Sequence, residues 1–205
     1  MSKTSRIANA LVRSGALKFG TFKLKSGMMS PYYIDLTWLL SSPRDFKCIV
    51  DVVVDEIKDF LSSKRVDKLA SIELKGALLL PSIANKLKLP CLVVRKEEKG
   101  YGITGRIAGG EVKEGENILF FDDVVSSAES KLEGIKPLEE LGAKVETVLV
   151  VVDREQGGKE RLENRGYKLQ ALTTISELVN NLFQSRKITR EQADNILDYT
   201  KKAIN

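Results

Sequence analysis

Residues 118–130 read ILFFDDVVSSAES, in which four apolar residues lead into two adjacent carboxylates and a turn rich in hydroxyl groups. A short, continuous apolar run is typical of a strand that is buried on both faces of a parallel sheet. Two acids at the end of such a strand are costly unless a ligand or a partner uses them. Because small residues follow the acids and a helical pattern begins near Ser130, the stretch predicts a strand–turn–helix unit with a functional end.

Comparable units follow one another along the chain. Strands are predicted at residues 69–74, 91–94, 118–121, 145–152 and 169–173, and helices at residues 77–87, 130–141, 158–165, 175–184 and 189–204. Before them come a helix over residues 2–15, a strand or hairpin within residues 19–36, and a helix over residues 46–61 that Ser42 and Pro43 introduce. This alternation predicts an α/β fold, with a mostly parallel sheet flanked by helices and ligands bound beyond the carboxyl ends of the strands.

The composition is that of an ordinary soluble globular protein. The 205 residues are 42% apolar and 30% charged, and they contain no apolar run of the length that crosses a membrane. The N-terminus lacks the apolar stretch of a signal peptide, so we expect a cytoplasmic location. Cys48 and Cys91 lie in apolar surroundings and are expected to be free core thiols in a reducing compartment.

The net charge and the absence of histidine limit the functions that the protein can have. A net charge of +5 fits a solvated Lys/Arg surface better than a polyanion site, and we expect no nucleic-acid partner because no recognition motif is present. The sequence contains no histidine, which excludes a Ser-His-Asp triad, a Cys-His pair and every His-ligated metal site. Catalysis must therefore use carboxylates, cations, tyrosines and backbone groups.

The turn after the acids suits a phosphate group. A helix N-terminus offers unpaired N–H groups and the positive end of the helix dipole, and Ser126, Ser127 and Ser130 add hydroxyl donors. Phosphate repels carboxylates, so Asp122 and Asp123 are better suited to neutral hydroxyl groups such as those of a ribose. The alternative is an ordinary turn with an Asp cap.

Residues 122–130, DDVVSSAES, resemble the phosphoribosyl-pyrophosphate (PRPP) signature of type I phosphoribosyltransferases. In that family the acids hold the ribose hydroxyls and the turn binds the 5-phosphate. The resemblance implies a PRPP site made of Asp122, Asp123, Val124, Val125, Ser126, Ser127, Ala128, Glu129 and Ser130.

A second segment, RKEEKGYGITGRIAGG at residues 95–110, reads as a polar, glycine-rich loop whose cations can close over a pyrophosphate. The alternative is a solvated hairpin tip. The segment resembles the catalytic loop of orotate phosphoribosyltransferases, which implies that Arg95, Lys96 and Lys99 bind PRPP. Tyr101, also placed at PRPP, stands where that family has a histidine.

A third segment, FGTFKLKSGMMSPYYIDL at residues 19–36, resembles the orotate-site segment of the same enzymes. Lys25 falls on a lysine that contacts the substrates, and Tyr32 and Tyr33 fall where aromatic residues flank the pyrimidine. A β-hairpin with core aromatics is the alternative reading.

Two further segments fit the same family. In VVVDREQGG, residues 150–158, a buried strand delivers Arg154 to the ligand edge, and a guanidinium binds a carboxylate through two parallel bonds. The resemblance assigns that carboxylate to orotate, whereas a structural Asp–Arg ion pair is the alternative. In ELKGALLLPSIANKL, residues 73–87, the resemblance places Lys75 at a turn that contacts the pyrophosphate of PRPP.

The resemblance covers nearly the whole chain and implies the type I phosphoribosyltransferase fold. It implies a single domain over residues 1–205, with about 1–40 forming a small N-terminal hood on the orotate side and about 65–175 the core. The implied reaction joins orotate to PRPP, giving orotidine 5'-monophosphate and pyrophosphate in pyrimidine (UMP) biosynthesis. The implied catalytic residues are Lys99, Asp123 and Lys25, and the implied orotate-binding residues are Lys25, Tyr32, Tyr33, Ser126 and Arg154. Mg²⁺ is expected to bind mainly through PRPP, without protein metal ligands, and the enzyme is expected to be a homodimer.

Three of the departures from the family pattern bear most on activity. Ala128 replaces a glycine, Glu129 places a carboxylate beside the expected phosphate, and Tyr101 cannot supply the cation that a histidine can. These departures keep a second reading open, a catalytically weak paralogue that binds PRPP or a nucleotide as a sensor or partner subunit. A third reading is another phosphoribosyltransferase with an altered base site.

Overall fold

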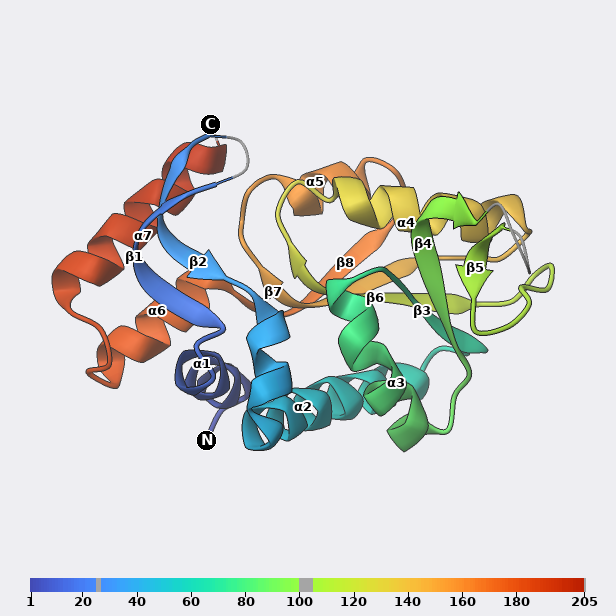
Figure 1. The fold of residues 1–205 in the computed structure, drawn as a ribbon, viewed down its shortest axis with the longest axis horizontal. Helices are drawn as coiled ribbons and strands as arrows, with labels where there is room; N and C mark the ends of the chain where they lie inside the picture. The colour runs from blue at the N-terminus through green and yellow to red at the C-terminus, as the bar shows by residue number, and fades with distance from the viewer. Residues whose placement is uncertain (25–26, 100–104, 205) are drawn as a thin grey trace.

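The computed structural model describes residues 1–24, 27–99 and 105–204, and shows a six-stranded sheet with helices on both faces (Figure 1). The strand order is β5–β4–β3–β6–β7–β8. The sheet consists of β3 (Lys68–Ile72), β4 (Cys91–Lys99), β5 (Gly105–Ala108), β6 (Ile118–Val125), β7 (Thr147–Asp153) and β8 (Lys168–Thr174). All neighbouring strands are parallel except β5, which pairs antiparallel with β4 at the edge. The predicted α/β fold is therefore confirmed.

The continuous apolar run of β6 is explained by burial on both faces. Its residues Leu119 and Phe121 pack into the core beneath α2 (Pro43–Leu61) and α3 (Lys75–Leu87). Phe120 packs on the other face against Ile135 and Leu138 of α4 (Glu129–Glu140). Helix α5 (Gly158–Glu163) lies on the same side of the sheet as α4 (Figure 1). A strand with two covered faces has no need of polar alternation.

A second, smaller layer lies at one end of the molecule. Strands β1 (Leu17–Lys23) and β2 (Met29–Ile34) form an antiparallel hairpin. Helix α7 (Arg190–Ile204) packs on β2, and α1 (Lys3–Arg13) packs on α6 (Ile175–Gln184) (Figure 1). We call these elements (α1, β1, β2, α6 and α7) the hood, which thus contains C-terminal helices as well as residues 1–40.

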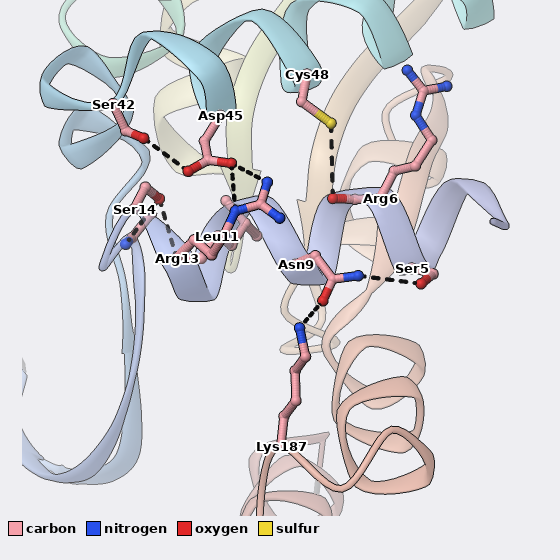
Figure 2. A network of polar contacts seen from close by, with 11 residues as sticks. Ser5, Arg6, Asn9, Leu11, Arg13, Ser14, Ser42, Asp45, Cys48 and Lys187 are labelled. Atoms are coloured by element: carbon pink, nitrogen blue, oxygen red, sulfur yellow. Dashed lines mark hydrogen bonds and ion pairs between the residues drawn. The ribbon is translucent and has the colours of Figure 1, made fainter.

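Polar contacts fasten the hood to the core helices (Figure 2). Asp45, only 3% exposed, accepts hydrogen bonds from the guanidinium of Arg13 on α1 and, at 2.8 Å, from the Ser42 hydroxyl. Ser42 is the N-cap of α2 as expected, but its side chain caps no backbone N–H because its hydroxyl donates to the Asp45 carboxylate instead. Lys187, in the connection between α6 and α7, donates to Asn9 of α1. The Arg13–Asp45 contact thus fastens α1 to α2, and the Lys187–Asn9 contact joins the N-terminal helix to the C-terminal part of the hood.

Several local predictions need correction. The segment 95–110 is not wholly a loop, because β4 continues to Lys99 and β5 pairs with it. Strand β6 continues past Phe121 to Val125, so both acids lie within the strand. A 3-10 helix, η1 (Leu36–Ser41), was not expected. Cys48 and Cys91 are free but only half-buried.

The described residues include no helix that combines the length and the apolar character needed to cross a bilayer.

Candidate functional site

The acidic pair lies at the carboxyl edge of the central strand β6, and both residues are 4% exposed. Asp122 is engaged through both carboxylate oxygens: its Oδ1 accepts the N–H of Asp123 at 2.9 Å, and its Oδ2 lies 2.6 Å from Nζ of Lys131. Asp123 makes no ion pair with any residue that the structure describes. The two neighbouring acids therefore have different surroundings.

Burial raises the pKa of Asp123 to about 7, and the charge of Asp122 adds to this shift. The cations of Lys131 and Lys75 and the backbone N–H of Val124 oppose it. A buried carboxylate near its pKa at neutral pH is typical of a functional site, since a ligand donor stabilises the ionised form.

The turn between β6 and α4, residues 126–128, is predicted to bind a phosphate and is called the phosphate turn. Ala128 adopts the left-handed conformation (φ 63°, ψ 4°), as a glycine would, and its methyl group is buried. Ala128 is the N-cap of α4, and no side chain caps the helix. The first N–H groups of the helix are thus left to a ligand. The alternative of an ordinary turn with an Asp cap is therefore wrong.

Glu129, the unexpected acid of this turn, is turned toward solvent and paired. Its side chain is 71% exposed, and Oε1 lies 3.1 Å from Nη1 of Arg161 on α5. The same guanidinium nitrogen donates to the carbonyl of Ser127 at 3.4 Å. A cation from the next helix thus offsets the carboxylate.

Arg154 follows β7 and is oriented by contacts on two sides. Its backbone N–H donates to the carbonyl of Val125 at 2.9 Å, which ties it to the end of β6. Its Nε donates to the hydroxyl of Tyr32 at 3.0 Å. The buried Nη2 atom finds no hydrogen-bond partner among the residues the structure describes. A buried guanidinium donor without a partner indicates an acceptor that arrives with a ligand.

The two tyrosines of β2 lie on opposite faces of the hairpin, as consecutive strand residues do. Tyr32 is fully buried, and burial raises the pKa of its hydroxyl. Its ring meets that of Tyr199 on α7 edge to face, 6.1 Å between centroids. Tyr33 is 39% exposed and packs on Phe22 at 5.7 Å. Tyr32 thus orients Arg154, whereas the ring of Tyr33 is accessible; the flanking of a pyrimidine by either stays a prediction.

Of the four cations predicted near a pyrophosphate, the structure describes the side chains of three, and their positions differ. Lys75 begins α3, and its Nζ lies 3.2 Å from Oδ1 of Asp35, which directly follows β2. Lys96 is exposed, and its backbone N–H donates to Glu73 at 2.8 Å. The side chain of Arg95 instead donates to the carbonyl of Gly105 across the β4–β5 pair, at 3.2 Å.

Two adjoining cavities collect most of the predicted residues. The smaller, about 500 Å³, is lined on the acidic side by Lys75, Lys96, Asp122, Asp123, Val124, Ser126, Ser130 and Arg154. The larger, about 1260 Å³, extends under the hairpin and is lined by Tyr33, Lys75, Ser126, Ser127, Glu129 and Arg154, among others. Because Ile34, Lys75, Ser126 and Arg154 line both cavities, the acids, the turn and the hairpin face one continuous space.

Some predicted residues are not brought to this space. Val125 and Ala128 are buried, and Arg95 and Tyr32 line neither cavity. Lys25 and Tyr101 lie outside the described residues, and for Lys99 the structure gives only the backbone, at the end of β4.

Sequence reasoning missed Lys131, Arg161 and Tyr199. Lys131 could have been found from the sequence, because it falls at helical spacing with Gly134, Ile135 and Leu138, which are all buried. A lysine in line with apolar positions is a candidate for a buried charge. Arg161 and Tyr199 gave no such signal, since arginine on a short helix and tyrosine on an amphipathic one are ordinary.

The chain was compared with known proteins. No protein-family model matches it. It is 33% identical over 193 residues to the orotate phosphoribosyltransferase of Pyrococcus horikoshii, an alignment that covers 94% of this chain and all of that protein.

Solved structures agree. UMP synthase of Leishmania donovani superposes with a TM-score of 0.85 at 30% identity, covering 98% of this chain and 43% of that one. Orotate phosphoribosyltransferase of Aeropyrum pernix superposes with a TM-score of 0.76 at 28% identity, covering 87% and 98%. With the acidic pair, the phosphate turn and Arg154 around one space, the chain belongs to the orotate phosphoribosyltransferase family.

Proposed function

We propose that this protein is an orotate phosphoribosyltransferase, which transfers the ribose 5-phosphate of PRPP to orotate in the synthesis of UMP. The products are orotidine 5'-monophosphate and pyrophosphate. One observation carries the proposal: the acidic pair, the uncapped turn and the partly unpartnered Arg154 line one continuous space. These groups match a ribose, a 5-phosphate and a carboxylate respectively.

The chemistry requires positioning and charge stabilisation, without a protein nucleophile. As pyrophosphate leaves, the anomeric carbon of the ribose becomes positively charged, and the new bond forms to a pyrimidine nitrogen. Asp123 would accept hydrogen bonds from the ribose hydroxyls, and residues 126–130 would hold the 5-phosphate. Lys75, Lys96 and Lys99 would neutralise the departing pyrophosphate.

On the other side of the space, Arg154 would bind the orotate carboxylate through its free Nη2 donor. Tyr33 offers an accessible ring for the pyrimidine, and Lys25 is proposed to contact both substrates.

Mg²⁺ is proposed to enter with PRPP. No group of three or more His, Cys, Asp or Glu side chains suited to a metal ion occurs in residues 1–24, 27–99 and 105–204. Since both oxygens of Asp122 already contact protein donors, the donor set fits an ion held mainly by the oxygens of PRPP. When bound, the ion would neutralise phosphate charge.

We also propose a homodimer in the cytoplasm. The family resemblance supports the homodimer, since the loop that carries Lys99 enters the neighbouring subunit's site in those enzymes. The cytoplasmic location is supported by the two free cysteines, Cys48 and Cys91, which fit a reducing compartment.

The geometry accommodates two of the three departures that keep open the reading as a catalytically weak sensor or partner subunit; the third, Tyr101, lies outside the described residues. Ala128 adopts the conformation that a glycine would supply, and Arg161 offsets the charge of Glu129.

A turnover assay tests the function. Purified protein mixed with Mg²⁺, PRPP and orotate is expected to consume orotate, followed by the loss of its absorbance, and to release pyrophosphate. Uracil and purine bases in place of orotate are the controls, and they should not react because they lack the carboxylate that Arg154 would bind. Absence of turnover with PRPP binding retained in calorimetry would support the sensor reading instead.

Replacing Glu129 with glycine is expected to change the KM for PRPP by less than about threefold, since exposed ion pairs contribute little energy. Arg161→Ala, measured beside it, should raise that KM more, because it leaves the carboxylate beside the turn without its cation. A tenfold gain in PRPP affinity for Glu129→Gly would show that the acid repels the phosphate.

A further inference from the structure

Lys131 is a buried cation in an unfavourable place. It is the third residue of α4, and its side chain is 6% exposed. The first turn of a helix carries the positive end of the dipole, and burial also disfavours a charged ammonium group. The other members of its stripe, Gly134, Ile135 and Leu138, show that an apolar side chain suits this face of the helix. A charged lysine side chain at this buried position requires strong hydrogen-bond acceptors.

Those acceptors lie on both sides of the phosphate turn. Nζ of Lys131 is 2.6 Å from Oδ2 of Asp122 and donates to the carbonyl of Val124, both on β6. It also lies 3.3 Å from the hydroxyl of Ser130, on α4. All four residues line the smaller cavity. One ammonium group therefore joins the end of the strand to the start of the helix, with residues 126–129 spanning between them.

The same contacts separate the roles of the two acids. One carboxylate oxygen of Asp122 contacts Nζ of Lys131, and the other accepts the N–H of Asp123. Asp123 lines the same cavity and has no ion pair within the described ranges. The charged groups around it are Asp122 on β6, Lys131 on α4 and Lys75 on α3, and the cavity wall adds Asp35, Glu73, Lys96 and Arg154.

We propose that Lys131 is a positioning residue for PRPP, which locks Asp122 and the phosphate turn together and leaves Asp123 as the carboxylate that accepts the ribose hydroxyls. This inference rests on the proposed function. The competing view is that the Asp122–Lys131 pair only stabilises the fold. Buried ion pairs are poor stabilisers, since apolar replacements are often neutral or favourable, so stability alone does not account for it.

Lys131→Met tests the proposal, because methionine nearly preserves the length and removes the charge. We expect the KM for PRPP to rise by about tenfold or more, because displacing a binding group by an ångström has effects of this size or larger. The KM for orotate should stay within about threefold, since no hydrogen bond or ion pair joins Arg154 to Lys131 among the described residues.

The pH profile is the readout that a purely structural role would not move. PRPP binding needs Asp123 ionised, and the ammonium of Lys131 lowers the pKa of that carboxyl. Removing the ammonium raises this pKa further, so the acid limb of kcat/KM for PRPP should move to higher pH. A shift of about one pH unit is the size that one close opposite charge produces.

Two further variants serve as controls. Lys131→Arg keeps the charge and should keep the acid limb near its wild-type position. Lys136→Met, on the same helix with a 74% exposed side chain, should match wild type in every measurement. A folded Lys131→Met protein with unchanged KM and an unmoved acid limb would overturn the proposal.

If Lys131→Met does not fold, the double variant Asp122→Asn with Lys131→Met removes both buried charges. It should fold and bring the acid limb back toward wild type, while the KM for PRPP stays raised because the link across the turn is lost. A wild-type KM in the double variant would refute the positioning role.

Calorimetric titration of PRPP separates this inference from the proposed function. If the wild type binds PRPP without forming product, the proposed function fails, but the weaker PRPP binding of Lys131→Met still supports the positioning role. If the wild type turns over and Lys131→Met binds PRPP equally well across pH 5–8, the inference alone fails.

Discussion

Replacing Arg154 with glutamine is expected to lower kcat/KM for orotate by about 10²–10³-fold, the range for losing a buried charge-assisted contact. The buried Nη2 donor lacks a hydrogen-bond partner among the described residues, and Tyr32 and the carbonyl of Val125 already set the position of the residue. Glutamine cannot offer two parallel donors with a positive charge. Steady-state kinetics with each substrate varied should show the loss mainly against orotate, and little change in PRPP affinity.

Two neighbouring variants sharpen this test. Arg154→Lys should recover little activity, because an ammonium group lacks the planar pair of donors. Tyr32→Phe should cost only about tenfold, since it removes one bond that orients the guanidinium and leaves the guanidinium itself. Equal losses of kcat/KM for orotate and for PRPP would argue that Arg154 supports the structure at the carboxyl edge of the sheet instead of binding orotate.

Replacing Gly76 with alanine is expected to lower both stability and PRPP turnover, by roughly 2–3 kcal/mol of unfolding free energy and about 10²-fold in rate. A β-carbon there would lie 2.3 Å from Oδ1 of Asp122, 2.5 Å from the Ser71 hydroxyl and 2.8 Å from the Asp122 Cα. The backbone of β6 must move to relieve this clash, and the acidic pair moves with it. Thermal unfolding and PRPP kinetics measure the two effects.

The matched control for Gly76→Ala is Asn85→Ala, an exposed change on the same helix. It should leave both quantities near wild type. A Gly76→Ala protein with normal PRPP kinetics would show that the acidic pair tolerates displacement, which would contradict the proposed role of Asp123 in holding the ribose.

The sheet was predictable because buried parallel strands leave a strong sequence signal. The runs around Phe120 and Val150 are apolar throughout, and both strands are covered on both faces. The missed elements lack this signal: residues 95–99 of β4 are all charged, and β5 is held to β4 by antiparallel pairing at the sheet edge. Pairing of backbone groups leaves little trace in the side chains.

The candidate site was predictable where strand ends carry it, as at Asp123 and Arg154, because the carboxyl ends of parallel strands share one edge. What the sequence could not tell was the direction of side chains within an element. Tyr32 and Tyr33 are identical in type, and only the packing of β2 decides which of them is buried. Lys131 is the same kind of case, since a lysine near a helix start usually faces water.

The sequence positions of the hood elements affect the order in which the protein folds during synthesis. The buried face of the hairpin β1–β2 is covered only when α7 packs on it, and α7 lies far along the chain from the hairpin. In the same way, α1 is covered only when α6 has formed. Closing so long a loop is entropically costly and comes late, whereas β3, β6 and β7 pair over shorter separations. During synthesis from the N-terminus, the acidic pair and the turn that follows it can form while the C-terminal helices are still missing. The hairpin side of the candidate site is then the last part to assemble.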